Sequence, residues 1–369
     1  VVTGGTPSTR KNEYWDNGDI PWLQSGCCQN CDVDSTEKYI TKEGYNNSST
    51  HMMSADTVMI ALTGATAGKV GYLKFEACGN QSITGILPCE SLNQRYLFFY
   101  LLSQREKILA DCVGGAQAHI SQSYVKNMTI PILAIKEQEQ IVGELTKVSN
   151  IVSLRQEEIQ QLDNLVKARF VEMFGDCTNM ISLSELCLII TDGTHQSPKF
   201  QHDGIPFILV SNLSKNTVTY DTDKFISAET YKELYKRTPI EIGDILLSIV
   251  GSYGHPAVVV EDRKFLFQRH IAYLKPKSDI LNSYYMHGAL LSPGCQRQIE
   301  EKVKGIAQKT LNLSEIRKIR IPVSSLDLQK QYADFVHQVN KSKFDTMTFA
   351  PIYAIINLYL HTYFYQGRR

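Results

Sequence analysis

The sequence lacks a net charge, because its 369 residues contain 38 lysines and arginines and 38 aspartates and glutamates. This balance does not by itself indicate a nucleic-acid partner, since proteins that bind nucleic acids often carry clustered positive charge. It does not exclude one either, because the local distribution of charge matters more than its sum. The length predicts about two or three domains. A hydrophobic share of 43% is sufficient for their cores.

Long hydrophobic runs are also absent. The nearest is residues 349–365, "FAPIYAIINLYLHTYFY", where Pro351, Asn357 and His361 interrupt the apolar residues. This run is shorter than the about 20 apolar residues that a membrane-spanning helix needs. We therefore expect no membrane span.

The nine cysteines do not indicate a set of disulfide bonds, because their number is odd, their spacing is irregular and no secretory signal precedes them. They indicate reduced thiols in a cytoplasmic protein. The segment "CCQNC" places Cys28 and Cys31 at C-x-x-C spacing, and Cys78 and Cys89 would complete four zinc ligands. Zinc sites usually combine two close couples. The second couple is too widely spaced, so zinc is the weaker alternative and we expect no metal site.

Recognisable catalytic motifs are missing as well. Residues 60–73, "IALTGATAGKVGYL", approximate the phosphate-binding loop G-x-x-x-x-G-K-[ST]. Gly64 and Gly68, however, enclose three residues instead of four, and Lys69 is followed by Val70, which offers no hydroxyl to Mg²⁺. The chain also lacks G-x-S-x-G and H-E-x-x-H motifs and a methyltransferase-like D/N-P-P-[YF] tetrapeptide. We therefore expect no catalytic residues and no cofactor in this chain.

What the sequence does contain is a repeat at an offset of about 190 residues, a feature that determines how the whole fold is interpreted. The matching blocks, in one order in both halves, are "TGGTPS" (3–8) with "TDGTHQSP" (191–198), "GDIPWLQSG" (18–26) with "DGIPFILVSN" (203–212), "ADTVMIALTGATAGKVG" (55–71) with "IGDILLSIVGSYGHPAV" (242–258), "VGGAQAHIS" (113–121) with "VKGIAQKTLN" (303–312), and "MTIPI" (128–132) with "IRIPV" (319–323). Gln117 and Gln308 each lie 14 residues before the proline of the last block. The chain is therefore a duplication.

Each copy combines short, β-branched apolar runs with fewer helical segments, around residues 93–110 and 282–303. This pattern predicts a mixed α/β (α+β) fold with loop-rich domains. Gly64 and Gly251 occupy matching places after a strand, where glycine allows positive φ and close approach of the backbone to a partner. We assign residues 1–134 and 177–324 to the two copies, with residues 135–176 and 325–369 as a helix after each. The chain begins at Val1, almost directly in a turn, and we expect its N-terminus to be clipped.

Residues 137–176 predict one long amphipathic helix, because they contain no proline and keep a 3–4 spacing of apolar residues with charged flanks. The seam consists of Ile141, Leu145, Val148, Val152, Ile159, Leu162, Val166 and Met173, with Arg155 and Arg169 in the remaining places. Adding 191 to these numbers gives a second mostly apolar seam that includes Tyr332, Val336 and Val339. Two long helices of matched phase are expected to pair as a coiled coil. The alternative is that each packs on its own domain.

The ordered, doubled set of motifs resembles the specificity subunit of type I restriction–modification systems over nearly the whole chain. The blocks that carry the resemblance are "GDILLSIVG", "GATAGKVG", "GGAQ", "GIAQ", "IPILAIKEQEQIVGEL" and "IPVSSLDLQKQYADFV". The resemblance implies two target recognition domains, each for one half of a bipartite sequence in double-stranded DNA. It also implies antiparallel helices that hold the domains apart and dock two methyltransferase (modification) subunits, which would bind S-adenosylmethionine. Restriction/translocase subunits would be added outside.

Two departures from the family pattern concern the ends of the chain. The start looks clipped, and residues 345–369 are nearly free of charge until Arg368 and Arg369. We therefore expect an atypical second helix. Two alternative functions remain open: a repeat-built scaffold that binds only proteins, and the specificity module of a fused restriction–methylation enzyme.

Candidate DNA contacts are polar or basic residues on the loops that recur in both copies, because phosphates and base edges require such donors and acceptors. In the first copy they are Arg10, Lys11, Thr63, Thr66, Lys69, Gln81, Gln117 and His119. In the second copy they are His195, Gln196, Ser197, Lys199, Ser252, Tyr253, His255, Arg269, His270, Gln308 and Lys309. The alternative is that these residues only form turns or carry solvated loop charges.

Overall fold

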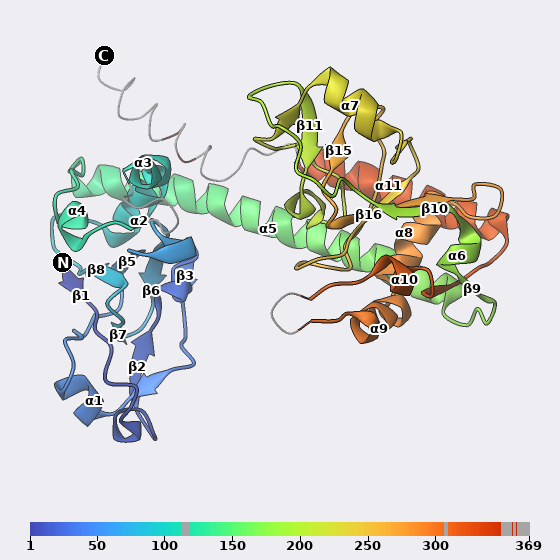
Figure 1. The fold of residues 1–369 in the computed structure, drawn as a ribbon. Helices are drawn as coiled ribbons and strands as arrows, with labels where there is room; N and C mark the ends of the chain where they lie inside the picture. Colours follow the sequence, from blue (N-terminus) through green and yellow to red (C-terminus); the bar gives the residue numbers. More distant parts are fainter. Residues whose placement is uncertain (112–118, 306–308, 348–355, 357–358, 360–369) are drawn as a thin grey trace, which may run out of the picture. The chain divides into compact units, whose positions relative to one another are not determined.

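The computed structural model describes residues 1–111, 119–305, 309–347, 356 and 359. The chain divides into two compact units. Unit 1 comprises Val1–Arg155 with Phe349–Arg369, and unit 2 comprises Gln156–Thr348. Helix α5 (Ile135–Phe174) contributes its first part to unit 1 and its second part to unit 2 (Figure 1).

Two small sheets form the body of unit 1. The larger has the strand order β1 (Val2–Thr3), β8 (Ile83–Ile86), β5 (Val58–Ala61), β6 (Val70–Leu73) and β3 (Cys31–Val33). Neighbouring strands are antiparallel except for β3, which lies parallel to β6. The smaller sheet has the order β4 (Tyr39–Ile40), β2 (Ile20–Leu23) and β7 (Cys78–Gly79).

Short helices and 3-10 turns complete unit 1. The α-helices are α1 (Lys42–Asn46), α2 (Gln94–Ser103), α3 (Arg105–Ala110) and α4 (Gln122–Lys126). The 3-10 turns are η1 (Asn12–Tyr14), η2 (Ser25–Cys27) and η3 (Gly64–Thr66). The glycine turn after β5 thus contains η3 and leads directly into β6.

The described residues of unit 2 form three sheets. The largest is antiparallel throughout, in the order β10 (Cys187–Asp192), β16 (Ile271–Pro276), β13 (Ile245–Ser248) and β14 (Pro256–Val258). The second has the order β12 (Phe225–Ile226), β11 (Ile205–Ile208) and β15 (Leu266–Phe267). The third pairs β17 (Arg320–Pro322) with β9 (Met180–Ser182).

The helices of unit 2 surround these sheets. They are α6 (Leu183–Leu186), α7 (Ala228–Tyr235), α8 (Ser283–Leu291), α9 (Pro293–Lys302), α10 (Leu313–Ile316), α11 (Leu326–Met347) and the 3-10 turn η4 (Val210–Leu213). No helix in the described part of the chain is long and apolar enough to cross a membrane.

The duplication seen in the sequence is repeated in the topology. Strand β2 lies antiparallel to β4 and parallel to β7, and β11 lies antiparallel to β12 and parallel to β15. Helices α2 and α8 begin in the same way, because Asn93 and Asn282 each accept hydrogen bonds from two backbone N–H groups of the first turn. The predicted mixed α/β fold with two copies is confirmed.

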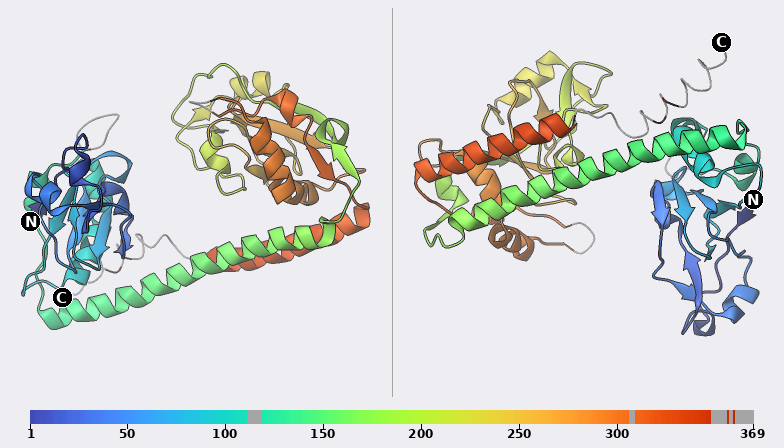
Figure 2. Two further views of the ribbon diagram at one scale, coloured as in Figure 1. Left: turned by 90° about the horizontal axis from the view of Figure 1, so that it is seen from below. Right: turned by 180° about the vertical axis from the view of Figure 1, so that it is seen from behind.

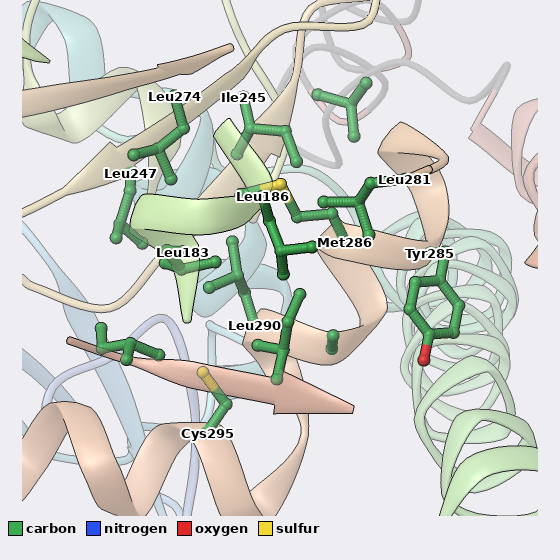
Figure 3. Packing of buried hydrophobic residues seen from close by; sticks show 14 of the residues in the cluster. Leu183, Leu186, Ile245, Leu247, Leu274, Leu281, Tyr285, Met286, Leu290 and Cys295 are labelled. Carbon is green, nitrogen blue, oxygen red and sulfur yellow. The ribbon is translucent and has the colours of Figure 1, made fainter. Parts of the chain in front are cut away.

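The central strands of both units are buried on both faces. In β13, Ile245 and Leu247 join the core around α8, whereas Leu246 packs on the opposite side. Residues of β5 alternate between two cores in the same way. Because successive side chains of a strand point to opposite faces, a strand covered on both sides requires a continuous apolar run. Figure 3 shows the core between β13, α6 and α8, with Leu186 and Met286 near Ile245.

Within unit 2, the second part of α5 lies beside α11 (Figure 2). The ion pair of Lys343 with Asp163 and the contact of the Arg169 guanidinium with the Phe335 ring, 5.8 Å from its centroid, show that the two segments run antiparallel. The Phe170 and Tyr332 rings lie 5.3 Å apart. Side chains of the second part of α5 therefore contact side chains of α11. Coiled-coil packing over the full helices stays a prediction.

The predicted seam of α5 contributes to two different cores. Ile141 and Leu145 are buried in unit 1, together with Ile356. Val166 is buried in unit 2, with Tyr332, Val336 and Val339. Seam residues between them are only partly buried, at Val148, Val152, Ile159 and Leu162. The most buried residues at the end of the helix are Phe170 and Phe174, which the spacing pattern did not select.

Candidate nucleic-acid interface

The candidate loops of the second copy meet at one end of the four-stranded sheet of unit 2. Strands β10 and β13 end there, whereas β16 and β14 begin there, as shown by the pairs Asp192 with Ala272, Ser248 with Ile271 and Leu247 with Pro256. In an antiparallel sheet the end of one strand lies beside the start of its neighbour. The fold therefore places side by side the loops that carry His195, Ser252, Tyr253, His255, Arg269 and His270.

Unit 1 brings the loops that carry Thr63, Thr66, Lys69 and Gln81 together in the same way, whereas Arg10 and Lys11 lie just before η1, where Lys11 contacts Tyr14. Thr63, Thr66 and Lys69 lie between the end of β5 and the start of β6, and Gln81 lies just before β8. Thr6, in the segment after β1, reaches this site as well, because its Oγ1 donates a hydrogen bond to Gln81 Oε1 at 2.5 Å. The equivalent ends of both sheets thus carry the polar loops.

The glycine turn and the G-x-x-Q segment are neighbours in both copies. Thr63 forms an antiparallel bridge with His119, and Val250 forms one with Thr310. Gly64 and Gly251 follow these residues with nearly equal φ angles of +72° and +73°, a conformation that side chains other than glycine rarely adopt. Gln117 and Gln308 lie outside the described residues, but the chain that flanks them lies beside the turn.

In each copy, a glycine in the segment after the first strand of the sheet lies very close to the backbone of the loop that carries the candidate residues. A Cβ atom on Gly4 would lie 2.0 Å from the carbonyl oxygen of Asn80, and one on Gly193 would lie 2.3 Å from that of Phe267. Thr194 then donates its N–H to Phe267 O at 3.0 Å, and Arg269 donates its N–H to Thr194 O at 3.1 Å. Glycine is required because a side chain would separate the two loops.

Most of the candidate residues are accessible to a partner. The exposed ones are Arg10, Lys11, Gln81, His119, His195, Gln196, Ser197, Lys199, Ser252, Arg269 and Lys309. The partly buried ones are Thr63, Thr66, Lys69, Tyr253, His255 and His270. Two lysines already have partners, since Lys69 Nζ donates to Gln29 Oε1 at 2.7 Å and Lys11 Nζ donates to the Tyr14 hydroxyl at 2.9 Å. The hydrogen bond to Tyr14 also raises the pKa of Lys11.

Two histidines of unit 2 are held in a partly buried environment that favours the neutral ring. Burial lowers the pKa of His255, whose Nδ1 lies 3.1 Å from Asn216 Oδ1. Burial and the neighbouring Arg269 lower the pKa of His270. Near pH 7 both rings therefore act as hydrogen-bonding groups instead of cations.

One charged cluster at this site was not found from the sequence. Asp192, the last residue of β10, accepts a hydrogen bond from Arg237 Nη2 at 2.6 Å and lies 3.0 Å from His195 Nε2. Arg237 follows α7 and has no counterpart in the matched blocks. The repeat in the sequence gives no sign of Arg237, because only the tertiary fold brings residue 237 to the end of β10.

The described cysteines differ widely in exposure. Among the residues that the structure describes, no group of three or more histidines, cysteines, aspartates or glutamates is arranged to hold a metal ion. Cys28 is buried and Cys31 is exposed. Burial raises the pKa of the Cys31 thiol, whereas a hydrogen bond with Cys28 lowers that of Cys27.

Comparison with known proteins identifies the family. The model of the type I restriction modification DNA specificity domain matches residues 1–164 and again residues 178–351. The chain therefore belongs to this family and contains two copies of its domain, and the resemblance inferred from the sequence is confirmed. The two matches follow the duplication of the sheets and of the polar loops.

Individual relatives are specificity subunits of type I restriction enzymes. The chain is 34% identical over 155 residues to the EcoR124I/EcoR124II specificity subunit of Escherichia coli, which covers 41% of this chain and 38% of that protein. It is 26% identical over 279 residues to the EcoBI specificity subunit of the same species, covering 73% of this chain and 56% of that protein. The chain thus spans only about four- to six-tenths of these two relatives.

Solved structures of the family are also similar. A crystal structure of the type I restriction–modification S subunit from M. genitalium has a TM-score of 0.47 and 15% sequence identity. The match covers 97% of this chain and 91% of that one.

Proposed function

We propose that this chain is the DNA sequence-recognition subunit of a type I restriction–modification complex, and that each copy recognises one half of a bipartite target in double-stranded DNA. The observation that carries the proposal is the matched site in the two copies. In both, a positive-φ glycine turn, the chain flanking the G-x-x-Q segment and polar loops lie at the same end of a sheet. Duplicated sites of this kind suit a target with two specific halves.

In this proposal the chain acts without catalytic residues or a bound cofactor. Two methyltransferase subunits dock on it and bind S-adenosylmethionine, and restriction/translocase subunits join the complex in the cytoplasm. Helix α5 and its partner α11 dock these subunits and fix the unspecified spacer between the half-sites. The 40 helical residues of α5 would span about 60 Å at about 1.5 Å per residue.

The test is to coexpress the full chain with its cognate methyltransferase subunits and map the methylated bases of the host genome. We expect one bipartite motif with a fixed spacer. Replacing Arg269 and Lys309 by alanine should relax one half of the motif, at about 1–3 kcal/mol for each lost base contact. The variant Lys69→Ala should affect only the other half.

Three results would contradict the proposal. Methylation that is absent or independent of sequence in the wild-type complex would reject DNA recognition by this chain. Equal relaxation of both halves by the substitutions in one copy would reject the assignment of one half-site to each copy. A chain that binds the methyltransferase subunits but never retards DNA in a mobility-shift experiment would instead be a protein scaffold.

A further inference from the structure

We infer that Arg237 contacts a base edge in the half-site recognised by the second copy, and that Asp192 is the residue that positions Arg237 and His195 for this role. The inference rests on the proposed function and adds two residues to it. Neither Asp192 nor Arg237 belongs to the candidate set that the sequence indicated.

Asp192 lies at a fixed position in the sheet. It is the last residue of β10 and pairs with Ala272 of β16, so its backbone is fixed at the end of the sheet where the polar loops gather. Its side chain is only 13% exposed, whereas those of Arg237 and His195 are 51% and 53% exposed. A fixed, largely buried carboxylate thus holds two accessible side chains.

Asp192 contacts Arg237 with one carboxylate oxygen and His195 with the other. Asp192 Oδ1 accepts from Arg237 Nη2 at 2.6 Å, and Asp192 Oδ2 lies 3.0 Å from His195 Nε2. A guanidinium has five N–H donors in a rigid plane, so one bond to the carboxylate leaves the other donors for a partner. Holding the side chain in advance reduces the rotamer entropy that binding would otherwise cost.

Asp192 and Arg237 carry opposite charges that balance each other in their ion pair. A balanced pair gains little from phosphate neutralisation, which depends on net positive charge. Its contribution is directional, and the preferred partner of a planar arginine fork is the pair of acceptors on guanine, O6 and N7. We therefore assign Arg237 to a base contact instead of a phosphate contact.

Arg269, a candidate DNA contact, lies next to the cluster of Asp192, His195 and Arg237. Arg269 donates its backbone N–H to Thr194 O at 3.1 Å, which places it next to the segment that carries His195. Thr194 also forms a parallel bridge with Gln268. The cluster of Asp192, His195 and Arg237 therefore adjoins a candidate loop of the same copy.

The experiment uses the full chain assembled with its cognate methyltransferase subunits. Binding is measured by competition against duplexes that each carry one substituted base pair in the half-site, at several salt concentrations. The variant Arg237→Lys keeps the charge but loses the planar fork. We expect it to lose discrimination at one base-pair position by roughly 5- to 150-fold, the equivalent of about 1–3 kcal/mol, with the salt dependence unchanged.

Four further variants, among them Arg237→Ala alone, separate the effect of side-chain position from that of charge. Asp192→Asn should bind all sequences slightly more tightly, because a negative charge is removed, yet lose discrimination at the same position as Arg237→Lys. The double variant Asp192→Asn with Arg237→Ala keeps the net charge and should lose no more discrimination than Arg237→Ala alone. Arg263→Ala removes an exposed arginine from the turn after β14, at the other end of the sheet, and should leave discrimination unchanged.

Distinct results overturn the inference and the proposed function. If the wild-type complex prefers no sequence, the proposed function fails. If it does prefer one, but Arg237→Lys discriminates as well as the wild type, the inference fails. It also fails if the arginine variants weaken binding evenly across all duplexes, which is the behaviour of a phosphate contact, or if Asp192→Asn only tightens binding. Unchanged melting temperatures of Arg237→Lys and Asp192→Asn exclude misfolding as the cause.

Discussion

The buried side chain of Gln329 fixes the start of α8 by accepting a hydrogen bond from the backbone N–H of Asn282 at 2.8 Å. Its Nε2 donates to Ser324 O at 2.9 Å and to Ile280 O at 3.1 Å. Gln138 makes the matching set of contacts in unit 1, where it accepts from Asn93 N–H at 2.8 Å. One amide side chain in each copy therefore ties the long helix to the domain that precedes it.

We predict that Gln329→Leu strongly destabilises unit 2. Leucine makes no side-chain hydrogen bonds and leaves three backbone groups without this partner, and each buried group of this kind costs about 1–3 kcal/mol. Gln331→Leu is the matched control, because Gln331 lies on the same helix and is exposed. Thermal unfolding of the two variants measures the difference, and equal melting temperatures would show that the buried amide contributes little.

A second prediction concerns the contact of α8 with the two long helices. A Cβ atom on Gly288 would lie 2.4 Å from the Tyr332 hydroxyl oxygen and 2.9 Å from the Phe170 ring. Gly288→Ala should therefore destabilise unit 2 by about 1–3 kcal/mol, the usual cost of overpacking a core.

Gly294→Ala is the control for this prediction. Gly294 lies in α9, where a Cβ atom would meet nothing within 4 Å, so alanine should stabilise by about 0.4–1 kcal/mol. Urea unfolding measures both changes. Stabilisation by both substitutions would show that the aromatic side chains move aside freely.

A third prediction is a loss of stability of unit 2 between about pH 7 and pH 5. Burial lowers the pKa of His287, whose Nε2 lies 3.1 Å from the carbonyl oxygens of Asn216 and Pro256. These carbonyls and Asp163 act in the opposite direction, and Lys343 lowers the pKa further. His255 and His270 are shifted in the same direction.

The sign follows from proton binding. A histidine with a pKa below that of the unfolded chain, about 6.5, binds fewer protons when folded, so stability is complete above pH 6.5 and falls as pH decreases below it. His287→Gln should reduce this dependence, whereas the exposed control His202→Gln should not. Denaturant unfolding at pH 7 and pH 5 measures the effect. An unchanged pH dependence in His287→Gln would remove this histidine as the cause.

A fourth prediction tests whether the helices set the spacer of the DNA target. Inserting four residues just before Asp163 in α5 and four just after Lys343 in α11 adds length on the same side of the Asp163–Lys343 pair, so the antiparallel partners stay opposite each other. The insertion adds about 6 Å of helix, nearly two base pairs at about 3.4 Å each. We expect the spacer to lengthen by one or two base pairs while both half-sites stay the same.

Mapping of the methylated motif measures the spacer in cells that carry the doubly extended chain. An insertion in α5 alone is the control, because it shifts the seam against an unchanged partner and should abolish or strongly reduce methylation. An active double variant with the original spacer would show that another element sets the distance.

The sequence by itself determined the duplication, the family and the regions of the candidate site. The blocks around Gly64 and Gly251 identified two matching turns, since local backbone requirements are written in the residues that form them. The apolar runs of β5 and β13 predicted strands because double burial demands continuous hydrophobicity. The long helix was predictable from its period and its lack of proline.

Only the tertiary structure decided which distant residues meet. The contact of Asp192 with Arg237 joins the end of β10 to the segment after α7, and no local pattern relates residues 45 positions apart. Phe170 and Phe174 are buried in addition to the seam residue Val166, and their burial depends on where Tyr285 and Tyr332 lie in space. Periodicity gives the face of a helix that becomes buried, but the side chains of its neighbours determine which residues fill the core.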